Sequence, residues 1–268
     1  MDRHTLLASI YPLRLQGITV YNAGPMAPAA GNFIRRLDRS EAIQNAMALD
    51  CYEPVQTQWA TAILTPGARF VDVGASFGHY TALASQIVGP GGEVFAFEPS
   101  PLPHDTIAAL IADNQIGNIR LVRSAVGDKT GEIDIFLPPK TDPVHSPSAF
   151  PSGDEFSACR VPVVALDDFA PLNDGRPIDL IKIDVEGSEP NVIAGMRRLI
   201  ERGLVRNVMC EFNSGWLRQN GGMTPAALLE TILGLGFSIR DRTEKTIGTE
   251  RDGIHQFELQ DMLFSRAP

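Results

Sequence analysis

The sequence predicts an α/β fold in which helices cover both faces of a mostly parallel sheet. Two observations predict it. Short apolar runs with the composition of buried strands alternate with helical patterns from residue 69 onward. The first of these runs is followed at once by a glycine-containing turn and a helix, as at the ligand-binding edge of open α/β sheets.

The expected elements follow one another in a regular order. Strands are expected at residues 69–73, 93–97, 119–122, 179–183, 205–212, 237–240 and 257–264. Helices are expected at residues 80–88, 102–116, 189–199 and 225–235. This alternation is typical of a parallel sheet, because each crossover helix returns the chain to the edge from which the previous strand began.

Residues 1–50 are expected to form an N-terminal, partly helical extension that caps one mouth of the domain formed by residues 51–268. Residues 24–31 contain the Gly and Pro typical of a linker, and apolar residues at helical spacing predict a helix over residues 39–49. A second helix is expected at residues 55–64, before the break at Thr65-Pro66-Gly67. Two copies of the chain could associate through these helices to form a homo-oligomer.

One region interrupts the alternation of strands and helices. Two β-like runs, at residues 132–137 and 160–165, flank a segment at residues 138–158 that is rich in Pro and Ser and has no periodicity. A loop of this length inside a compact domain is usually functional or disordered. We expect this segment to be a mobile flap on the substrate side.

Composition and charge narrow the classes of function. Hydrophobic residues make up 44% of the 268 residues and charged residues 21%, as in ordinary globular proteins. A net charge of −9 argues against nucleic acid as the main partner, because phosphate binding needs clustered Lys and Arg. Cys51, Cys159 and Cys210 form no C-x-x-C pair and are expected to be free thiols. The chain shows neither a signal peptide nor a membrane span, so we expect a cytoplasmic protein.

The glycine turn has the pattern Asp72-x-Gly74-x-x-x-Gly78, between a strand and a helix. Glycine lets the backbone turn sharply and approach a ligand closely, and the N-terminus of the following helix offers unpaired N–H groups. The dinucleotide-binding form G-x-G-x-x-G is absent, because Ser76 and His79 stand where it would need glycine. The turn therefore indicates a Rossmann-like site without a cradle for a pyrophosphate.

An acidic residue follows the second strand. Glu98-Pro99 lies about twenty residues after the glycines, where a carboxylate can accept hydrogen bonds from both hydroxyls of a ribose. A ribose-binding acid together with a phosphate-free turn indicates a nucleoside cofactor. S-adenosylmethionine is the common one.

Five short motifs follow one another along residues 51–240: YEP at 52–54, FVDVGASFGHYT at 70–81, FEP at 97–99, AVGDKTG at 125–131 and IKIDVEG at 181–187. In this order they resemble the FkbM family of methyltransferases, and the KIDVEG element is the most specific of them. The resemblance implies a class I methyltransferase fold with a seven-stranded sheet whose last strand is antiparallel. It also implies methyl transfer to oxygen, on a hydroxyl of a sugar or of a polyketide-like or peptide-like natural product.

The resemblance also implies roles for the cofactor residues. Asp72, Gly74 and Gly78 would hold the methionine part, with Ala75 and Ser76 in the same turn. Glu98 would bind the ribose beside Pro99. The remaining cofactor contacts would come from Ser124 and Ala125, at the adenine, and from Glu53 and Asp184 in the pocket wall.

Asp184 lies just past one expected strand and Glu211 at the end of the next, and the two strands should end at the same edge of the sheet. One interpretation makes Asp184, Glu211 and Asn213 oxygen ligands of Mg²⁺, which would lower the pKa of an acceptor hydroxyl. The alternative has no metal, and Asp184, Glu211, His79 or His145 then acts as the general base.

Lys182 shares a strand face with Asp184 and should offset its charge. Glu189 has the position of an acid at a helix N-terminus, where it would have a structural role.

Two other functions remain open at this point. One is a non-catalytic module that binds S-adenosylmethionine. The other is an NAD-linked oxidoreductase, which the missing third glycine argues against.

Overall fold

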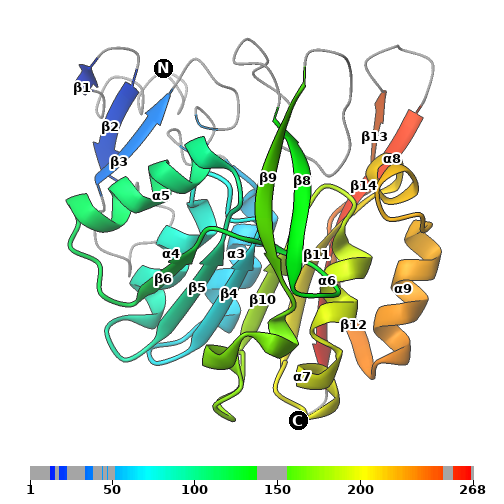
Figure 1. The fold of residues 1–268 in the computed structure, drawn as a ribbon. Coiled ribbons are helices and arrows are strands. Elements are labelled where there is room, and N and C mark those ends of the chain that lie inside the picture. The colour runs from blue at the N-terminus through cyan, green and yellow to red at the C-terminus, as the bar shows by residue number, and fades with distance from the viewer. Residues whose placement is uncertain are drawn as a thin grey trace.

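The computed structural model describes residues 13–15, 18–22, 34–38, 44, 47, 52–137, 156–249 and 256–266. Its centre is a sheet with the strand order β12-β14-β11-β10-β4-β5-β6, and β13 pairs with β14 outside this path (Figure 1). The strands are β4 (Arg69–Val73), β5 (Glu93–Phe97), β6 (Ile119–Val122), β10 (Leu180–Ile183), β11 (Asn207–Asn213), β12 (Phe237–Arg242), β13 (Thr246–Thr249) and β14 (Gln256–Arg266). All seven predicted strands are confirmed, with bounds that shift by a few residues.

The directions of the strands match the expectation. Strands β4, β5, β6, β10 and β11 are parallel, whereas β14 runs antiparallel to both β11 and β12. The chain moves outward from β4 through β5 to β6, then returns to β10 on the other side of β4. The carboxyl ends of β4 and β10 therefore form a topological switch point, where open α/β sheets bind ligands.

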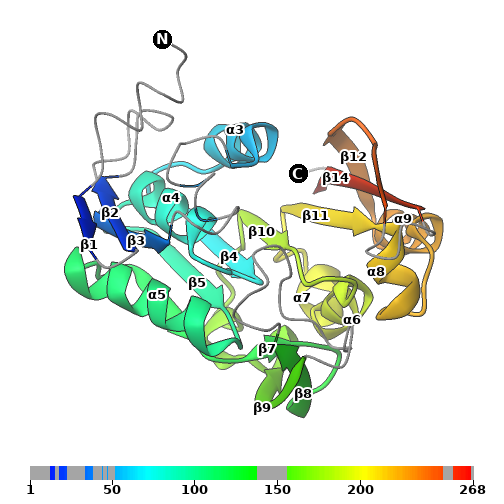
Figure 2. The same ribbon diagram turned by 90° about the horizontal axis from the view of Figure 1, so that it is seen from above.

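Helices pack on both faces of this sheet (Figure 2). They are α3 (Pro54–Ile63), α4 (His79–Val88), α5 (Pro101–Asp113), α6 (Glu189–Gly195), α7 (Arg197–Glu201), α8 (Ser214–Gln219) and α9 (Pro225–Gly234). Phe70 and Val94 pack with residues of α3 and α4, whereas Val71 and Phe95 pack with residues of α6, α7 and α9. This alternation along β4 and β5 builds two halves of one core, one on each face. None of the helices described is both long and apolar enough to cross a bilayer.

The predicted helix at residues 189–199 is divided at Met196, which has non-helical φ and ψ of −120° and 15°. Gly195, immediately before it, has no room for a side chain, because a Cβ there would lie 1.9 Å from the carbonyl oxygen of Gly127. The predicted single helix is therefore two short helices, α6 and α7, and the glycine at the end of α6 lets it pack closely on the loop after β7.

The N-terminal extension contains strands that the sequence analysis did not predict. β1 (Leu13–Leu15), β2 (Ile18–Asn22) and β3 (Ile34–Asp38) form an antiparallel sheet, and β3 lies beside α5 (Figures 1 and 2). Gln44 and Met47 are helical and buried, as the helix predicted over residues 39–49 requires. The expected linker at residues 24–31 lies outside the described residues. Strands this short owe their stability to pairing and packing with other segments, so their own residues carry little signal.

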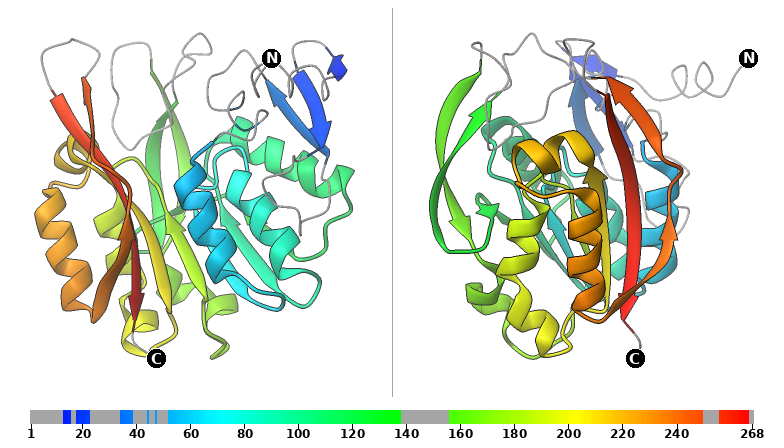
Figure 3. Two further views of the ribbon diagram at one scale, coloured as in Figure 1. Left: turned by 180° about the vertical axis from the view of Figure 1, so that it is seen from behind. Right: turned by 90° about the vertical axis from the view of Figure 1, so that its right-hand side faces the viewer.

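A second small sheet interrupts the α/β alternation (Figure 3). Its strands are β7 (Ala125–Val126), β8 (Gly131–Leu137) and β9 (Ser157–Val164), with β8 and β9 antiparallel and β7 parallel to β9. The two β-like runs predicted around the flap are confirmed as these strands, and β9 begins within the range assigned to the flap. Residues 138–155 lie outside the part of the chain that the structure describes.

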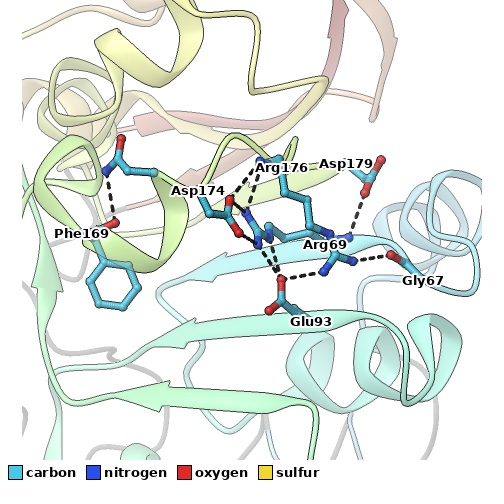
Figure 4. A network of polar contacts seen from close by, with 8 residues as sticks. Gly67, Arg69, Glu93, Phe169, Asp174, Arg176 and Asp179 are labelled. Carbon is cyan, nitrogen blue, oxygen red and sulfur yellow. Dashed lines mark hydrogen bonds and ion pairs between the residues drawn. The ribbon is translucent and has the colours of Figure 1, made fainter.

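A network of ion pairs ties the amino ends of β4, β5 and β10 together (Figure 4). Arg69 is 1% exposed, and its guanidinium lies 2.6 Å from carboxylate oxygens of both Glu93 and Asp174. Arg176 also binds Glu93, at 2.8 Å, and the side chain of Asp179 accepts a hydrogen bond from the backbone N–H of Arg69 at 2.8 Å. The network lies at the opposite edge of the sheet from the switch point, and it fixes the relative positions of the strands that end there.

Candidate active site

A cavity of about 250 Å³ opens at the carboxyl ends of β4, β5, β10 and β11. Among the described residues, those that line it include no Lys or Arg and the following five acids: Glu53, Glu98, Asp184, Glu186 and Glu211. The cavity therefore occupies the expected switch point, and its wall is acidic.

The glycine turn forms the floor of the cavity. The backbone N–H groups of Gly74 and Ala75 both donate to the carbonyl of Phe97 at 3.1 Å, which ties the turn to the end of β5. Gly74 has a φ of +82°, and a Cβ there would lie 1.9 Å from the carbonyl oxygen of Asp184. Gly74 and Ser76 line the cavity. Only glycine permits this approach of β4 to β10.

Ala75 and Gly78, which the sequence suggested as cofactor residues, are not among the residues that line the cavity. Ala75 is buried against Ala96 and Ile107 below the turn. Gly78 precedes α4 with a φ of +78°, and a Cβ there would lie 2.9 Å from Cγ1 of Ile107. These two residues allow α5 to pack under the turn.

Glu98 lies in the cavity wall where the sequence placed a ribose-binding acid. It is 5% exposed, and its two carboxylate oxygens each accept one backbone N–H, from Ser76 and Ser100, at 2.8 Å. Burial raises the pKa of Glu98 to about 7, against the lowering effect of these hydrogen bonds. Each carboxylate oxygen can accept a second hydrogen bond, so the side chain is oriented and still has capacity for a ligand.

Asp72 lies below the cavity and does not line it. It is 1% exposed, and Oδ2 accepts a hydrogen bond from the hydroxyl of Thr81 at 2.6 Å. Burial raises its pKa to about 6, against the attraction of Lys182. The side chain of Asp72 therefore anchors α4 to β4 below the cavity, and its predicted role in holding the methionine part stays a prediction.

The wall near Ser124 and Ala125 is partly apolar. Both residues line the cavity, together with Phe97, Val126, Ile133 and Ile135. The hydroxyl of Ser124 donates to the carbonyls of Ala125 at 2.8 Å and Pro162 at 3.1 Å, which joins β7 to β9. Sequence reasoning did not assign Ile133 and Ile135 to the site, although their alternation in the predicted strand at 132–137 put them on one face.

Asp184 lies at the end of β10 and forms an ion pair with Lys182. The distance from Nζ of Lys182 to Oδ2 of Asp184 is 2.6 Å, and Nζ lies 4.9 Å from the centre of the Tyr80 ring. Burial alone would lower the pKa of Lys182, but Asp184, Glu53 and Asp72 together raise it above its ordinary value. The predicted compensation of Asp184 by Lys182 is confirmed.

Glu211 faces the cavity from β11 with no hydrogen-bond partner for its side chain among the described residues. Burial, followed by the charges of Asp184 and Glu186, raises the pKa of its carboxyl well above the ordinary value. A carboxyl that faces the cavity with a raised pKa is a candidate general base.

Glu53 lines the cavity from the residue before α3. Its backbone is left-handed, with a φ of 43°, and its Oε2 accepts a hydrogen bond from the hydroxyl of Tyr80 at 2.7 Å. Tyr52 lies next to it in the same wall. The predicted position of Glu53 in the cavity wall is confirmed.

His79 does not line the cavity, so the structure does not support it as a general base. Its ring packs edge-on against Tyr52 and Tyr80, with centroid distances of 5.2 and 4.9 Å, and Nε2 lies 3.1 Å from the hydroxyl oxygen of Thr57. These contacts hold Tyr52 and α3 against the start of α4. The other histidine candidate, His145, lies outside the described residues.

Asn213 was predicted as a metal ligand, but it caps a helix instead. Its Oδ1 accepts the backbone N–H groups of Gly215 at 3.1 Å and Trp216 at 3.2 Å, at the start of α8. This use of its acceptor oxygen is the ordinary role of Asn at an N-cap. Within the described part of the chain, no group of three or more His, Cys, Asp or Glu residues is arranged to hold a metal ion.

The turn that follows β10 is supported by Glu189, in the structural role predicted for it. Oε1 of Glu189 accepts the backbone N–H groups of Val185 and Gly187 at 3.1 Å each. Burial raises the pKa of Glu189 to about 7, against the effect of these hydrogen bonds. Glu186 between them has a left-handed backbone, with a φ of 52°, and lines the cavity.

Comparison with known proteins decides the family. The model of the methyltransferase FkbM domain matches residues 72–239, more than half of the chain. The chain belongs to the FkbM methyltransferase family. Methyltransferase sdnD from Sordaria araneosa is 28% identical over 238 residues, which cover 76% of this chain and 87% of that protein.

Solved structures of low sequence identity are also similar to this FkbM methyltransferase. They include an rRNA methylase from Streptococcus thermophilus, with 13% identity, coverage of 80% of this chain and 95% of that one, and a TM-score of 0.43. Precorrin-6y C5,15-methyltransferase from Geobacter metallireducens GS-15 has 12% identity, coverage of 80% and 89%, and a TM-score of 0.46. The strand order and the antiparallel β14 are those of a class I methyltransferase fold.

Proposed function

We propose that this methyltransferase uses S-adenosylmethionine to methylate a hydroxyl oxygen of a small molecule, such as a sugar or a natural product. One observation carries the proposal. Glu98 and Glu211, to which we assign ribose binding and removal of the acceptor proton, line the same acidic cavity.

The residues present fit an adenosyl group. Glu98 is held by two backbone N–H groups and can still accept both ribose hydroxyls. Val126, Ile133 and Ile135 offer an apolar surface beside it for an adenine ring. The missing Cβ at Gly74 lets the turn after β4 pack closely against Asp184, so that both residues line the same cavity.

The charge of the wall supports a cationic cofactor over a phosphorylated one. Five acids and neither Lys nor Arg are found among the described lining residues, so a pyrophosphate would lack compensation and meet repulsion. A sulfonium and an ammonium would instead be stabilised. This argues against an NAD-linked oxidoreductase, and equally against an acceptor whose phosphates must enter the cavity.

S-adenosylmethionine supplies a methyl group on a positively charged sulfur. The cavity residues would orient the acceptor so that its hydroxyl oxygen lies in line with the methyl carbon and the sulfur. The carboxylate of Glu211 would take the hydroxyl proton as the carbon–oxygen bond forms and the carbon–sulfur bond breaks. The products are a methyl ether and S-adenosylhomocysteine.

The proposal is tested by incubating the protein with S-adenosylmethionine and a panel of sugars, macrolides and peptides. We expect one added methyl group by mass, located on oxygen by NMR. With the acceptor found, Glu211→Gln should lower kcat by about 10²- to 10⁴-fold, the usual contribution of a general base, and retain affinity for S-adenosylhomocysteine. Glu230→Gln, an exposed residue of α9, serves as the charge-matched control. A methyl group on nitrogen or carbon, or an undiminished kcat in Glu211→Gln, would contradict the proposal.

A further inference from the structure

The acidic cavity has two ends, which lie on opposite sides of the glycine turn. Glu98 follows β5, on one side of β4. Asp184 follows β10 and Glu211 lies near the carboxyl end of β11, both on the other side of β4. Glu53 belongs to the second end, because α3, which starts after it, is joined to β14 by the hydrogen bond of Gln56 to Asp261 at 2.6 Å. With the adenosine at Glu98, the amino-acid part of S-adenosylmethionine extends toward this second end.

We infer that Glu53 binds the α-ammonium of the methionine moiety and so selects a ligand that carries an amino-acid group. The assignment rests on the proposed use of S-adenosylmethionine. It gives a ligand contact to a residue that precedes the region matched by the FkbM domain.

The position of Glu53 is fixed before any ligand binds. The hydroxyl of Tyr80 donates to its Oε2 at 2.7 Å, and Tyr80 itself is 3% exposed, in the core between α3 and α4. The neighbouring Tyr52 also lines the cavity. A carboxylate has about four acceptor positions, so Glu53 keeps acceptor capacity for an ammonium after accepting the hydrogen bond from Tyr80.

The other acids at this end are less suited to the ammonium. Asp184 is already paired with Lys182 at 2.6 Å. Glu211 is assigned to the acceptor proton in the proposed reaction, and burial with the charges around it raises the pKa of its carboxyl well above the ordinary value. Lys182 is the cation that faces this group of acids, and it lies beneath Asp184 rather than in the cavity wall. Since Lys182 pairs with Asp184, the ammonium of a ligand would supply a second positive charge beside Glu53.

The test compares two ligands that differ in the amino-acid group. S-adenosylhomocysteine carries the ammonium and carboxylate, whereas 5′-methylthioadenosine carries the adenosine and sulfur alone. Calorimetry should show that Glu53→Gln weakens S-adenosylhomocysteine about 10- to 100-fold, the loss expected for one charged hydrogen bond. Its affinity for 5′-methylthioadenosine should stay within a factor of two of the unmodified protein. Glutamine still offers an oxygen to Tyr80 but presents an N–H₂ group in place of a carboxylate oxygen.

Three further variants make the comparison decisive. Glu98→Gln should weaken both ligands, and Glu230→Gln, which makes the same change in net charge at an exposed site, should weaken neither. Tyr80→Phe removes the hydrogen bond that holds Glu53 and should weaken S-adenosylhomocysteine selectively, by a smaller factor.

The inference is overturned if Glu53→Gln weakens both ligands equally, or weakens neither. A different result separates the proposed function from it: if the unmodified protein binds neither ligand, S-adenosylmethionine is not the cofactor, and the assignment fails with it.

Discussion

Replacing Gly74 with alanine tests the claim that the cavity floor depends on a missing side chain. The added Cβ would lie 1.9 Å from the carbonyl oxygen of Asp184 and 3.2 Å from Cγ1 of Val185, at a φ of +82°. A left-handed backbone costs an alanine about 1–2 kcal/mol. Forcing a methyl group into packed structure costs about 1–3 kcal/mol more. We therefore expect Gly74→Ala to lower the free energy of unfolding by about 2–5 kcal/mol.

Gly67→Ala separates the two contributions. Gly67 has nearly the same φ, +85°, but no atom lies within 4 Å of its hypothetical Cβ. It should lose only the conformational part, about 1–2 kcal/mol, and keep its affinity for S-adenosylhomocysteine. Urea unfolding followed by circular dichroism measures both variants, and calorimetry measures binding. Equal losses of stability in the two variants would refute the close approach of β4 to β10 as the reason for glycine at position 74.

Three other predictions follow from the buried polar groups. Arg69→Met should lower the free energy of unfolding by about 2–4 kcal/mol at pH 7 in urea unfolding, with Glu93 and Asp174 being 41% and 48% exposed. Arg69 holds the pKa of Asp174 well below its ordinary 3.8, so this stabilisation is present above pH 3.8, and the stability curves of the two proteins should begin to converge only as the pH falls below that value. Because burial raises the pKa of Glu189 from 4.5 to about 7, its contribution to stability is present below pH 4.5 and lost as pH rises through 7. The free energy of unfolding of Glu189→Gln should therefore gain up to about 3 kcal/mol over that of the unmodified protein between pH 5 and pH 8, and parallel pH profiles would contradict this. Asn213→Ala should cost about 1 kcal/mol of stability, which Asn213→Asp restores, without changing ligand affinity in calorimetry; a loss of affinity at unchanged stability would contradict the cap.

The glycine turn shows what a sequence motif can predict and where it stops. The pattern of Asp72, Gly74 and Gly78 correctly predicted a strand, a turn and a helix, because these depend on local backbone geometry. It did not predict which way each side chain points. Asp72 faces α4 because it alternates along β4 with Val71 and Val73, which face the other half of the core. A motif alone therefore puts Asp72 and Gly74 in one site, although only Gly74 lines the cavity.

Asn213 and His79 were assigned to the site from the sequence but have other contacts in the structure, one set local and one distant. Asn213 stands between a strand and a helix, and this position favours an N-cap at least as strongly as a metal ligand. For His79, the competing contacts come from Tyr52 and Thr57, more than twenty residues earlier in the chain. No spacing pattern reports contacts of that kind, so the aromatic packing of His79 could be found only in the folded structure.

Long-range pairing explains the elements that were missed. The strand β3 pairs with β2 and lies beside α5, and neither contact has a periodic signal in residues 1–50. By contrast, the strands of the main sheet each bury several consecutive apolar side chains, which is a strong signal in the sequence itself. Burial within one element is therefore predictable, whereas the partners of short strands are not.

The two edges of the sheet differ in how their carboxylates are compensated. At the amino edge, Arg69 and Arg176 neutralise the carboxylates around them, so the edge is balanced without a ligand. At the carboxyl edge, burial raises the pKa of Glu98 to about 7 and that of Glu211 well above its ordinary value, which means that ionising these carboxyls costs free energy. On the proposed assignment, a ligand with a sulfonium and an ammonium lowers that cost and a ligand with phosphates increases it. The preference for a cationic cofactor would then follow from the excess of acids in the cavity wall. The fold would tolerate this excess because the ion pairs at the amino edge hold the strands in place.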